Sequence, residues 1–267
     1  MEGRRTGPHL AAMSNAADGS KPVRIDALLA ERGLAPSREK AQALVLAGQV
    51  LADEQKIEKP GRKVRPDADL RLLGKGLRYV GRGGLKLEAA LDAYGIDVQG
   101  LTCLDVGAST GGFTDCLLQR GAAKVYAVDV GTNQLDWRLR QDPRVEVREQ
   151  VNARTLSTEE VPERCGFACA DVSFISVTLI LPAITDLLAP DASLVILVKP
   201  QFEAGRGQVG KGGVVRDEAV RRAAAEKVRR AVDELGFGRI EVMDCPVAGA
   251  EGNRELLLWA SGREFGG

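Results

Sequence analysis

The sequence predicts an α/β protein in which a doubly wound, mostly parallel sheet follows a small α+β domain. Three observations predict this architecture. A strand runs into a glycine turn and a helix over residues 101–118, strand and helix patterns alternate from there to the C-terminus, and two short helices followed by short strands fill residues 24–73. Ligands of doubly wound sheets bind at the carboxyl ends of the strands, so we expect the glycine turn to contact a ligand.

The N-terminal part of the chain is expected to form its own small domain. Residues 1–22 have no apolar periodicity and predict a disordered leader. From Arg24 the apolar spacing is helical up to Gly33, and Ser37 is placed to cap a second helix that ends before Gly48. The glycines between Gly74 and Gly84 predict a linker. We therefore expect one domain over residues 23–81, linker included, and a second over residues 82–267.

Charge is distributed unevenly along the chain. The whole sequence has 37 basic and 37 acidic residues, yet residues 21–85 hold 14 Lys and Arg against 8 Asp and Glu. The remainder is correspondingly acidic. A basic module joined to an acidic one indicates a catalytic domain delivered to a polyanion, although a solvated charged face gives the same pattern.

Several classes of protein are disfavoured by composition. Five cysteines are an odd number, and no signal peptide is visible, which indicates a reducing compartment and hence the cytoplasm. Cys165 and Cys169 lie four residues apart, but no second pair accompanies them and the only histidine is His9, so we expect no metal site. No apolar run approaches the roughly 20 residues that a membrane-spanning helix needs.

The larger domain is expected to begin with a helix whose apolar stripe runs from Leu85 to Tyr94. The strand at Leu101 and the helix that starts at Phe113 follow it. The remaining predicted elements are strands at 124–129, 145–147, 167–171 and 194–199, helices at 177–188 and 217–235, and two late strands near Ile240 and Leu256.

The spacing of the glycine turn narrows the choice of ligand. Gly107 and Gly111-Gly112 form G-x-x-x-G-G, which differs from the dinucleotide pattern G-x-G-x-x-G, and Phe113 stands where a phosphate-binding loop has lysine. The second strand ends in Asp129, where doubly wound folds place a carboxylate that accepts ribose hydroxyls. The alternative is a tight turn that uses glycine only for close packing.

Four charged side chains stand where strand ends and turns would bring them to the ligand side of the sheet: Lys86, Asp171, Lys199 and Glu255. Each also has an ordinary structural interpretation. Lys86 suits an exposed helix position, Asp171 a cap, Lys199 a strand end before proline, and Glu255 the protein surface.

Taken together, these motifs resemble known families. Residues 101–112 are similar to the first motif of S-adenosylmethionine-dependent methyltransferases, within a Rossmann-like sheet. Residues 24–50 resemble the alpha-L RNA-binding fold of a small-subunit ribosomal protein and of pseudouridine synthases. The phrases Gly83–Leu87, Ala170–Phe174, Leu197–Glu203 and Gly252–Glu255 resemble the Lys-Asp-Lys-Glu set of FtsJ-type ribose 2′-O-methyltransferases. From Val23 to Ser261 the chain is thus similar to the TlyA family of ribosomal RNA methyltransferases, whose members are also called haemolysins.

The resemblance implies methyl transfer from S-adenosylmethionine to a ribose 2′-hydroxyl of RNA within ribosomal subunits. It implies neither a metal nor a membrane partner, and it leaves the oligomeric state open. It implies catalytic roles for Lys86, Asp171, Lys199 and Glu255. The phosphate contacts that it implies are Arg24, Arg38, Lys40 and Lys63. The cofactor contacts that it implies are Asp105, Gly107, Ala108, Ser109, Gly111, Gly112, Phe113 and Asp129.

The implied mechanism is physically reasonable. A ribose hydroxyl is a poor nucleophile until a base withdraws its proton, and Lys199 can act as that base only as a neutral amine, which a nearby positive charge such as Lys86 or the sulfonium favours. Asp171 and Glu255 would orient the two amines. Holding the reactants in a near-attack geometry can remove roughly 7–11 kcal/mol of barrier.

Three other functions fit the sequence less well than methyl transfer to ribose. A membrane-active haemolysin predicts a membrane-active segment or a secretion signal, and the sequence shows neither. An RNA-binding protein with an inactive methyltransferase fold would tolerate loss of the lysines, yet Lys86 and Lys199 are both present. A base methyltransferase is disfavoured because Asp171 is followed by Val-Ser-Phe and not by Pro-Pro-aromatic.

Overall fold

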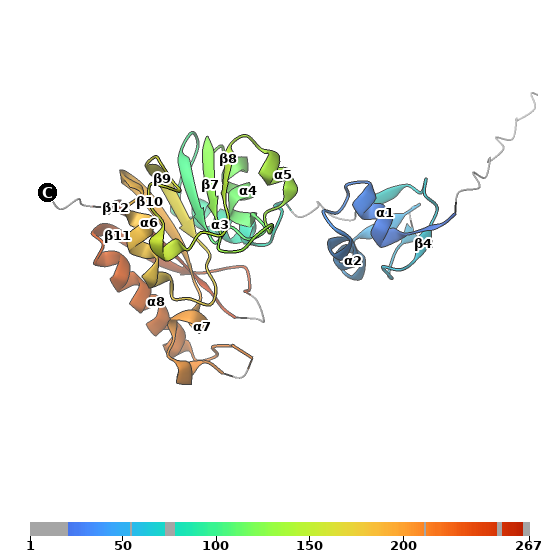
Figure 1. Cartoon of the computed structure of the whole chain (residues 1–267). Helices are drawn as coiled ribbons and strands as arrows, with labels where there is room; N and C mark the ends of the chain where they lie inside the picture. The colour runs from blue at the N-terminus through green and yellow to red at the C-terminus, as the bar shows by residue number, and fades with distance from the viewer. Residues whose placement is uncertain (1–20, 54, 73–77, 211, 250–252, 264–267) are drawn as a thin grey trace, which may run out of the picture. The chain divides into compact units, whose positions relative to one another are not determined.

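The computed structural model describes residues 21–53, 55–72, 78–210, 212–249 and 253–263 (Figure 1). It divides into two compact units, Met1–Gly76 and Leu77–Gly267. The predicted leader, apart from residues 21 and 22, and residues 74–77 of the predicted linker region lie outside the described residues.

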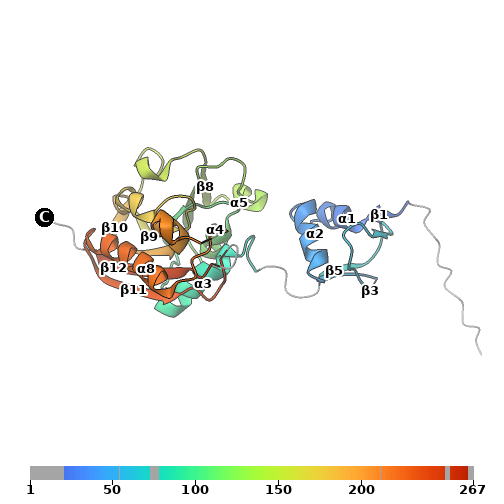
Figure 2. The same cartoon turned by 90° about the horizontal axis from the view of Figure 1, so that it is seen from below.

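In its described residues, the smaller unit contains the two predicted helices and five short strands. Its elements are β1 (Val23–Arg24), α1 (Ile25–Glu31), α2 (Arg38–Leu46), β2 (Val50–Ala52), β3 (Gln55–Lys56), β4 (Lys63–Val64) and β5 (Leu70–Leu72). As predicted, Ser37 caps α2, because its Oγ accepts a hydrogen bond from the Lys40 amide at 3.2 Å. Strand β2 pairs antiparallel with β3 and β5, and α1 and α2 lie on one side of this sheet (Figure 2). Ile25, Leu29 and Ile57 form the centre of the core between them.

The larger unit is built on a seven-stranded sheet in the order β11-β12-β10-β9-β6-β7-β8. Strands β10, β9, β6, β7 and β8 are parallel, and the order reverses at β6, which confirms the predicted doubly wound sheet. The elements are α3 (Gly83–Tyr94), β6 (Thr102–Val106), α4 (Gly112–Gln119), β7 (Lys124–Val128), α5 (Trp137–Gln141), β8 (Val145–Arg148), η1 (Ala153–Thr155), β9 (Cys165–Ala170), η2 (Val177–Leu179), α6 (Leu181–Thr185), β10 (Leu188–Val198), α7 (Pro200–Glu203), η3 (Arg206–Gln208), α8 (Glu218–Asp233), β11 (Phe237–Asp244) and β12 (Leu256–Arg263).

Helices cover both faces of this sheet. On one face α3 and α4 bury Leu87 and Leu117 against Cys103 and Phe167 of the sheet. On the other face α6 and α8 bury Ile184 and Val228, and Figure 1 shows α8 in orange and red beside β11 and β12. Because the central strands β6, β7 and β9 and the second half of β10 are covered on both sides, their sequences are mostly apolar and do not alternate.

Three sequence-based expectations differ from the structure. The helix predicted over 177–188 is broken into η2 and α6, because Pro182 has no amide hydrogen and suits only the first turn of a helix. Strand β10 begins at Leu188 and not at residue 194, with an irregular register between Leu188 and Ser193. Strand β12 runs antiparallel to β10 and β11, a direction that the alternation of elements does not reveal.

The boundary between the units also lies earlier than the predicted one at residues 81 and 82. Tyr79 is 2% exposed within the core of the larger unit. Its hydroxyl donates a hydrogen bond to Glu88 at 3.0 Å, and the Val80 amide donates one to Asp115 at 2.7 Å. The larger unit therefore includes residues 78–81, which the glycine content had assigned to the linker.

Candidate active site

The predicted site residues gather at one edge of the large sheet because the strand ends are level. Val106 pairs with Val128 on one side and with Ala170 on the other, so the residues that follow β6, β7 and β9 emerge together. Lys199 directly follows β10. Glu255 directly precedes the antiparallel strand β12, whose Leu256 pairs with Val198, so it reaches the same edge from the opposite chain direction.

The four predicted catalytic side chains form two ion pairs in one cavity. Lys86 Nζ lies 2.5 Å from Glu255 Oε2, and these side chains are 10% and 2% exposed. Lys199 Nζ lies 2.6 Å from Asp171 Oδ1, a contact not aligned as a hydrogen bond, and it donates a hydrogen bond to Ser173 Oγ at 2.8 Å. All four charged residues line a cavity of about 360 Å³.

The charges of this tetrad cancel, since each ammonium group has one carboxylate partner. Burial of the Lys86–Glu255 pair removes both groups from most of the water, and their short contact offsets part of that desolvation cost. Such a pair contributes little net stability but fixes the position of the Lys86 amine. The arrangement can therefore hold two amines at defined places around a reacting group.

The glycine turn forms the floor of the cavity. Gly107 has a φ of +85°, and a Cβ at this position would lie 2.4 Å from the carbonyl oxygen of Asp171. Only glycine fits there, so the turn packs closely against the end of β9 and also lines the cavity. Close packing is thus shown at this residue, and ligand contact stays a prediction.

Asp129 organises a second cavity beside the first. Its carboxylate accepts hydrogen bonds from the amides of Ser109 at 2.8 Å and of Gly131 at 2.7 Å. It lines a cavity of about 570 Å³ that shares Gly107, Ser109 and Asp171 with the first. A carboxylate has room for further donors, so Asp129 can also accept ribose hydroxyls. Because the two cavities share residues, they adjoin, and together they are wide enough for an elongated ligand.

Not all of the predicted cofactor residues line these cavities. Gly107, Ala108, Ser109, Gly112, Phe113 and Asp129 line one or both of them. Asp105 and Gly111 line neither cavity. Gly111 has a φ of +94° at the N-terminus of α4, where a Cβ would collide with Leu135 and Leu139. Glycine is therefore needed at position 111 to allow the shape of the turn.

Asp105 is fully buried beneath the turn. Its Oδ2 accepts a hydrogen bond from Thr114 Oγ1 at 2.7 Å. Burial raises the pKa of this carboxyl to about 7, because the interior disfavours the charged form. Since the pKa is raised in the folded state, burial of Asp105 costs nothing at low pH and becomes increasingly unfavourable as the pH rises from about 4 to 7. Through its hydrogen bond with Thr114, Asp105 links the end of β6 to the first turn of α4.

The four predicted phosphate contacts lie in the smaller unit, and two of them share one buried carboxylate. Asp26 is fully buried, and its Oδ2 lies 2.8 Å from Arg24 Nη2 and 3.1 Å from Arg38 Nε. The hydrogen bond from Arg24 holds the pKa of Asp26 well below its usual range despite burial. Lys63 is the strand partner of Arg24, and Lys40 is exposed on α2. The arginine side chains remain 45% and 54% exposed, so their outer atoms are accessible.

Sequence reasoning missed several residues that contact the predicted site residues, among them Asp26, Ser173 and Thr114. Ser173 binds the Lys199 amine, and Thr114 binds Asp105. Ser173 lies two residues after Asp171 in the sequence, and this proximity was the only indication that it could belong to the site. A hydroxyl residue near a strand end is too common to identify a role.

Among the residues that the structure describes, no group of three or more His, Cys, Asp or Glu side chains is arranged to hold a metal ion. Within the same ranges no helix is both long and apolar enough to cross a membrane.

Comparison with known proteins identifies relatives of both units. The model of the FtsJ-like methyltransferases matches residues 79–261, and that of the S4 domain matches residues 23–70. The chain is 47% identical over 241 residues to the 16S/23S rRNA (cytidine-2′-O)-methyltransferase TlyA of Mycobacterium tuberculosis, covering 90% of each chain. It is 42% identical to Hemolysin A of Brachyspira hyodysenteriae, covering 88% of this chain and 98% of the relative.

A solved structure from Streptococcus thermophilus, described as that of a candidate hemolysin, superimposes with a TM-score of 0.68 and 45% sequence identity. The alignment covers 90% of this chain and 88% of that one. Both units have therefore been seen together in a relative.

Proposed function

Because the chain belongs to the FtsJ-like methyltransferase family, we propose that it transfers a methyl group from S-adenosylmethionine to a ribose 2′-hydroxyl of ribosomal RNA. The observation that carries this proposal is the pairing of Lys86 with Glu255 and of Lys199 with Asp171 around one cavity. The Mycobacterium tuberculosis relative, whose name states this reaction on cytidine, supports it. With RNA in ribosomal subunits as the substrate, the proposed location is the cytoplasm.

The residues that line the joined cavities fit the proposed cofactor. Gly107 lines the first cavity without a side chain that would project into it, and Asp129 offers acceptors for the ribose hydroxyls. Gly107, Ser109, Gly112 and Phe113 would surround the rest of the molecule. When bound, S-adenosylmethionine supplies the electrophilic methyl group.

The protein would contribute position and one proton transfer. As a neutral amine, Lys199 Nζ accepts the proton of the substrate 2′-hydroxyl and becomes an ammonium group. Asp171 Oδ1 and Ser173 Oγ hold this group at 2.6 Å and 2.8 Å so that it faces the cavity. Lys86, held by Glu255, places a positive charge in the lining of the same cavity, where it can stabilise the developing alkoxide. Both ion pairs are largely screened from water, which strengthens these interactions.

The identity of the methylated atom tests the proposal directly. We expect that incubation with ribosomal subunits and labelled cofactor places the label on a ribose 2′-oxygen. Methylation blocks that oxygen from attacking its own phosphate, so alkaline hydrolysis leaves an uncut, labelled dinucleotide. Label recovered in mononucleotides as methylated base would contradict the proposal.

The S4 domain is proposed to supply most of the RNA affinity, with Arg24, Arg38, Lys40 and Lys63 as phosphate contacts. A protein that begins at Leu77 is expected to bind the cofactor as the full chain does and to lose most of its RNA affinity in a filter-binding or calorimetric titration. It must begin at Leu77, because a start at Arg82 would remove Tyr79 from the core. The RNA affinity of the full chain should also fall steeply with salt.

The control for this truncation is a protein that lacks only residues 1–20, which precede the S4 match. It should bind RNA as the full chain does. Undiminished RNA binding by the protein that begins at Leu77 would show that the larger unit carries the affinity itself.

Asp129→Ala is expected to weaken cofactor binding by about 1–3 kcal/mol in calorimetry, because a charged acceptor of ribose hydroxyls is lost. The variant also frees the Ser109 amide, so part of the loss reflects the turn. Asp97→Ala is the matched control, since Asp97 also accepts a hydrogen bond from an amide two residues on, but lies outside both cavities. Equal cofactor affinity in the Asp129 variant and the wild type would exclude Asp129 as a ribose contact.

A further inference from the structure

We propose that Glu203 is a positioning residue for the Lys199–Asp171 half of the tetrad, an inference that rests on the proposed function. Glu203 is the last residue of α7, four residues after Lys199, and it is not among the cavity-lining residues. It therefore acts through other residues and not on the substrate.

The Glu203 carboxylate is buried and fully occupied. The residue is 7% exposed. Its Oε1 accepts a hydrogen bond from the Val177 amide at 2.7 Å, and its Oε2 accepts from Ser176 Oγ at 2.5 Å and from Lys227 Nζ at 2.9 Å. Removing a carboxylate from water is unfavourable unless strong partners replace the water, and here an amide, a hydroxyl and a cation do so.

These contacts join two segments that carry the site. One segment follows β9 and runs from Asp171 through Ser173 to Val177, and the other follows β10 and runs from Lys199 to Glu203. Strands β9 and β10 are neighbours in the sheet. The Lys199–Asp171 ion pair joins the two segments where they leave the sheet, and Glu203 joins them again at their far ends. The segments are thus fastened at two points.

The residues between the two fastenings need such support. Phe174 has a φ of +65°, a strained conformation for an aromatic residue, and it is 93% exposed. Its ring makes a tilted contact with Phe202, with a centroid distance of 5.3 Å. Ser173, which binds the Lys199 amine, is the preceding residue. Without Glu203 the strained segment would be free to relax and to carry Ser173 away from Lys199.

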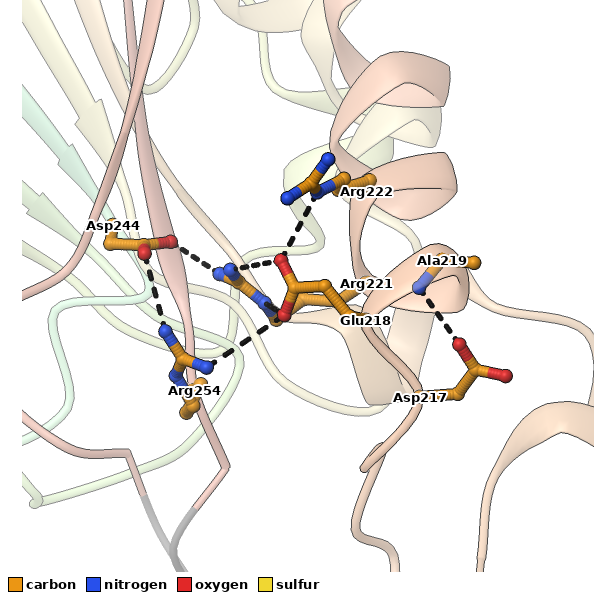
Figure 3. A network of polar contacts seen from close by, with 7 residues as sticks. All are labelled: Asp217, Glu218, Ala219, Arg221, Arg222, Asp244 and Arg254. Carbon is orange, nitrogen blue, oxygen red and sulfur yellow. Dashed lines mark hydrogen bonds and ion pairs between the residues drawn. The ribbon is translucent and has the colours of Figure 1, made fainter.

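Helix α8 contacts Glu203, and by separate residues it also contacts the segment that carries Glu255, in the other half of the tetrad. Lys227 of α8 reaches Glu203. At the start of the same helix, buried Arg221 binds Glu218 and Asp244, and Arg254 binds the same two acids (Figure 3). Arg254 directly precedes Glu255. The two ion pairs of the tetrad therefore have distinct supports, which allows the effect of Glu203 to be separated from a general loosening of α8.

The test compares Glu203→Ala and Glu203→Gln with the matched control Glu226→Gln. Glu226 lies on α8 and pairs with Arg229 at 2.8 Å on the surface. At saturating RNA and cofactor, the single-turnover rate of Glu203→Ala should fall by roughly 10- to 100-fold, since a displacement of about 1 Å can cost that much. Glu203→Gln, which keeps an acceptor for the Val177 amide, should lose less. Cofactor affinity should be unchanged in all three variants, and the rate of the control should equal that of the wild type.

A second measurement separates positioning from lost stability. The reactivity of each lysine is followed against pH by competitive labelling and mass spectrometry, well below the unfolding temperature of each variant. In Glu203→Ala the titration curve of Lys199 should shift while that of Lys86, held by Glu255, stays in place. Equal shifts of both lysines, or a wild-type rate in Glu203→Ala, would overturn the proposal.

Failure of the Glu203 proposal can be distinguished from failure of the proposed function by comparing the Glu203 and Lys199 variants. An inactive Lys199→Ala protein together with a fully active Glu203→Ala protein removes only the role of Glu203. Transfer that survives in Lys199→Ala removes the proposed mechanism itself.

Discussion

Lys199→Ala is expected to lower methyl transfer by roughly 10²–10⁴-fold, the usual contribution of a positioned general base, while cofactor affinity remains nearly intact. The amine is held by Asp171 and Ser173 at the wall of the cavity, so its removal takes away the proton acceptor without changing the glycine turn. Single-turnover transfer to ribosomal subunits measures the rate, and calorimetry with S-adenosylmethionine measures binding.

Lys124→Ala provides the control for this substitution. Lys124 is a surface lysine that pairs with Glu163 at 2.8 Å, so its loss should leave the transfer rate unchanged. If Lys199→Ala transferred methyl at the wild-type rate, Lys199 would not be the base. A parallel loss of cofactor affinity would instead mean that the lysine shapes the cofactor cavity.

Gly107→Ala is expected to lower the free energy of unfolding by roughly 2–5 kcal/mol and to impair cofactor binding, because it combines backbone strain with overpacking. The new methyl group would lie 2.4 Å from the Asp171 carbonyl oxygen, so either the turn or the end of β9 must move. Movement of Asp171 also displaces the partner of Lys199. Chemical denaturation measures the stability, and calorimetry measures the cofactor affinity.

Gly100→Ala separates strain from collision in this experiment. Gly100 has a φ of +73°, but a Cβ there would meet nothing within 4 Å. Its replacement should therefore cost only about 1–2 kcal/mol, the price of a left-handed alanine, and leave cofactor affinity unchanged. Similar losses in the two variants would show that the contact between Gly107 and Asp171 is not tight.

The sheet and its ligand edge were predictable because each depends on local pattern. Buried parallel strands give continuous apolar runs, and residues that follow such strands meet at one edge, as Asp129, Asp171 and Lys199 do. The pairing within the tetrad was not predictable from pattern. Glu255 reaches Lys86 only because β12 runs antiparallel, and strand direction depends on contacts distant in sequence.

The distinction between residues that line the cavity and residues that shape it also required the structure. Asp105 and Gly107 belong to one motif in the sequence, yet Gly107 lines the cavity while Asp105 is buried beneath it. Strand alternation would place Asp105 and Gly107, two residues apart, on the same face of the sheet. Strand β6 ends at Val106, however, so Gly107 belongs to the turn and does not follow this rule. Tyr79 was misassigned for a related reason, since the glycines around it suggested a linker although its ring is buried against Gly84.

If RNA binds the smaller unit as proposed, the buried carboxylate of Asp26 affects how many ions are released. Asp26 is fully buried and contacts both Arg24 and Arg38, so the three groups together carry a net charge of about one and should displace fewer cations from RNA phosphates than two isolated arginines. For Lys40 and Lys63 the described residues provide no ion pair, so each should neutralise one phosphate and release the cation condensed there. The slope of log affinity against log salt concentration should therefore report about three of these four positive charges.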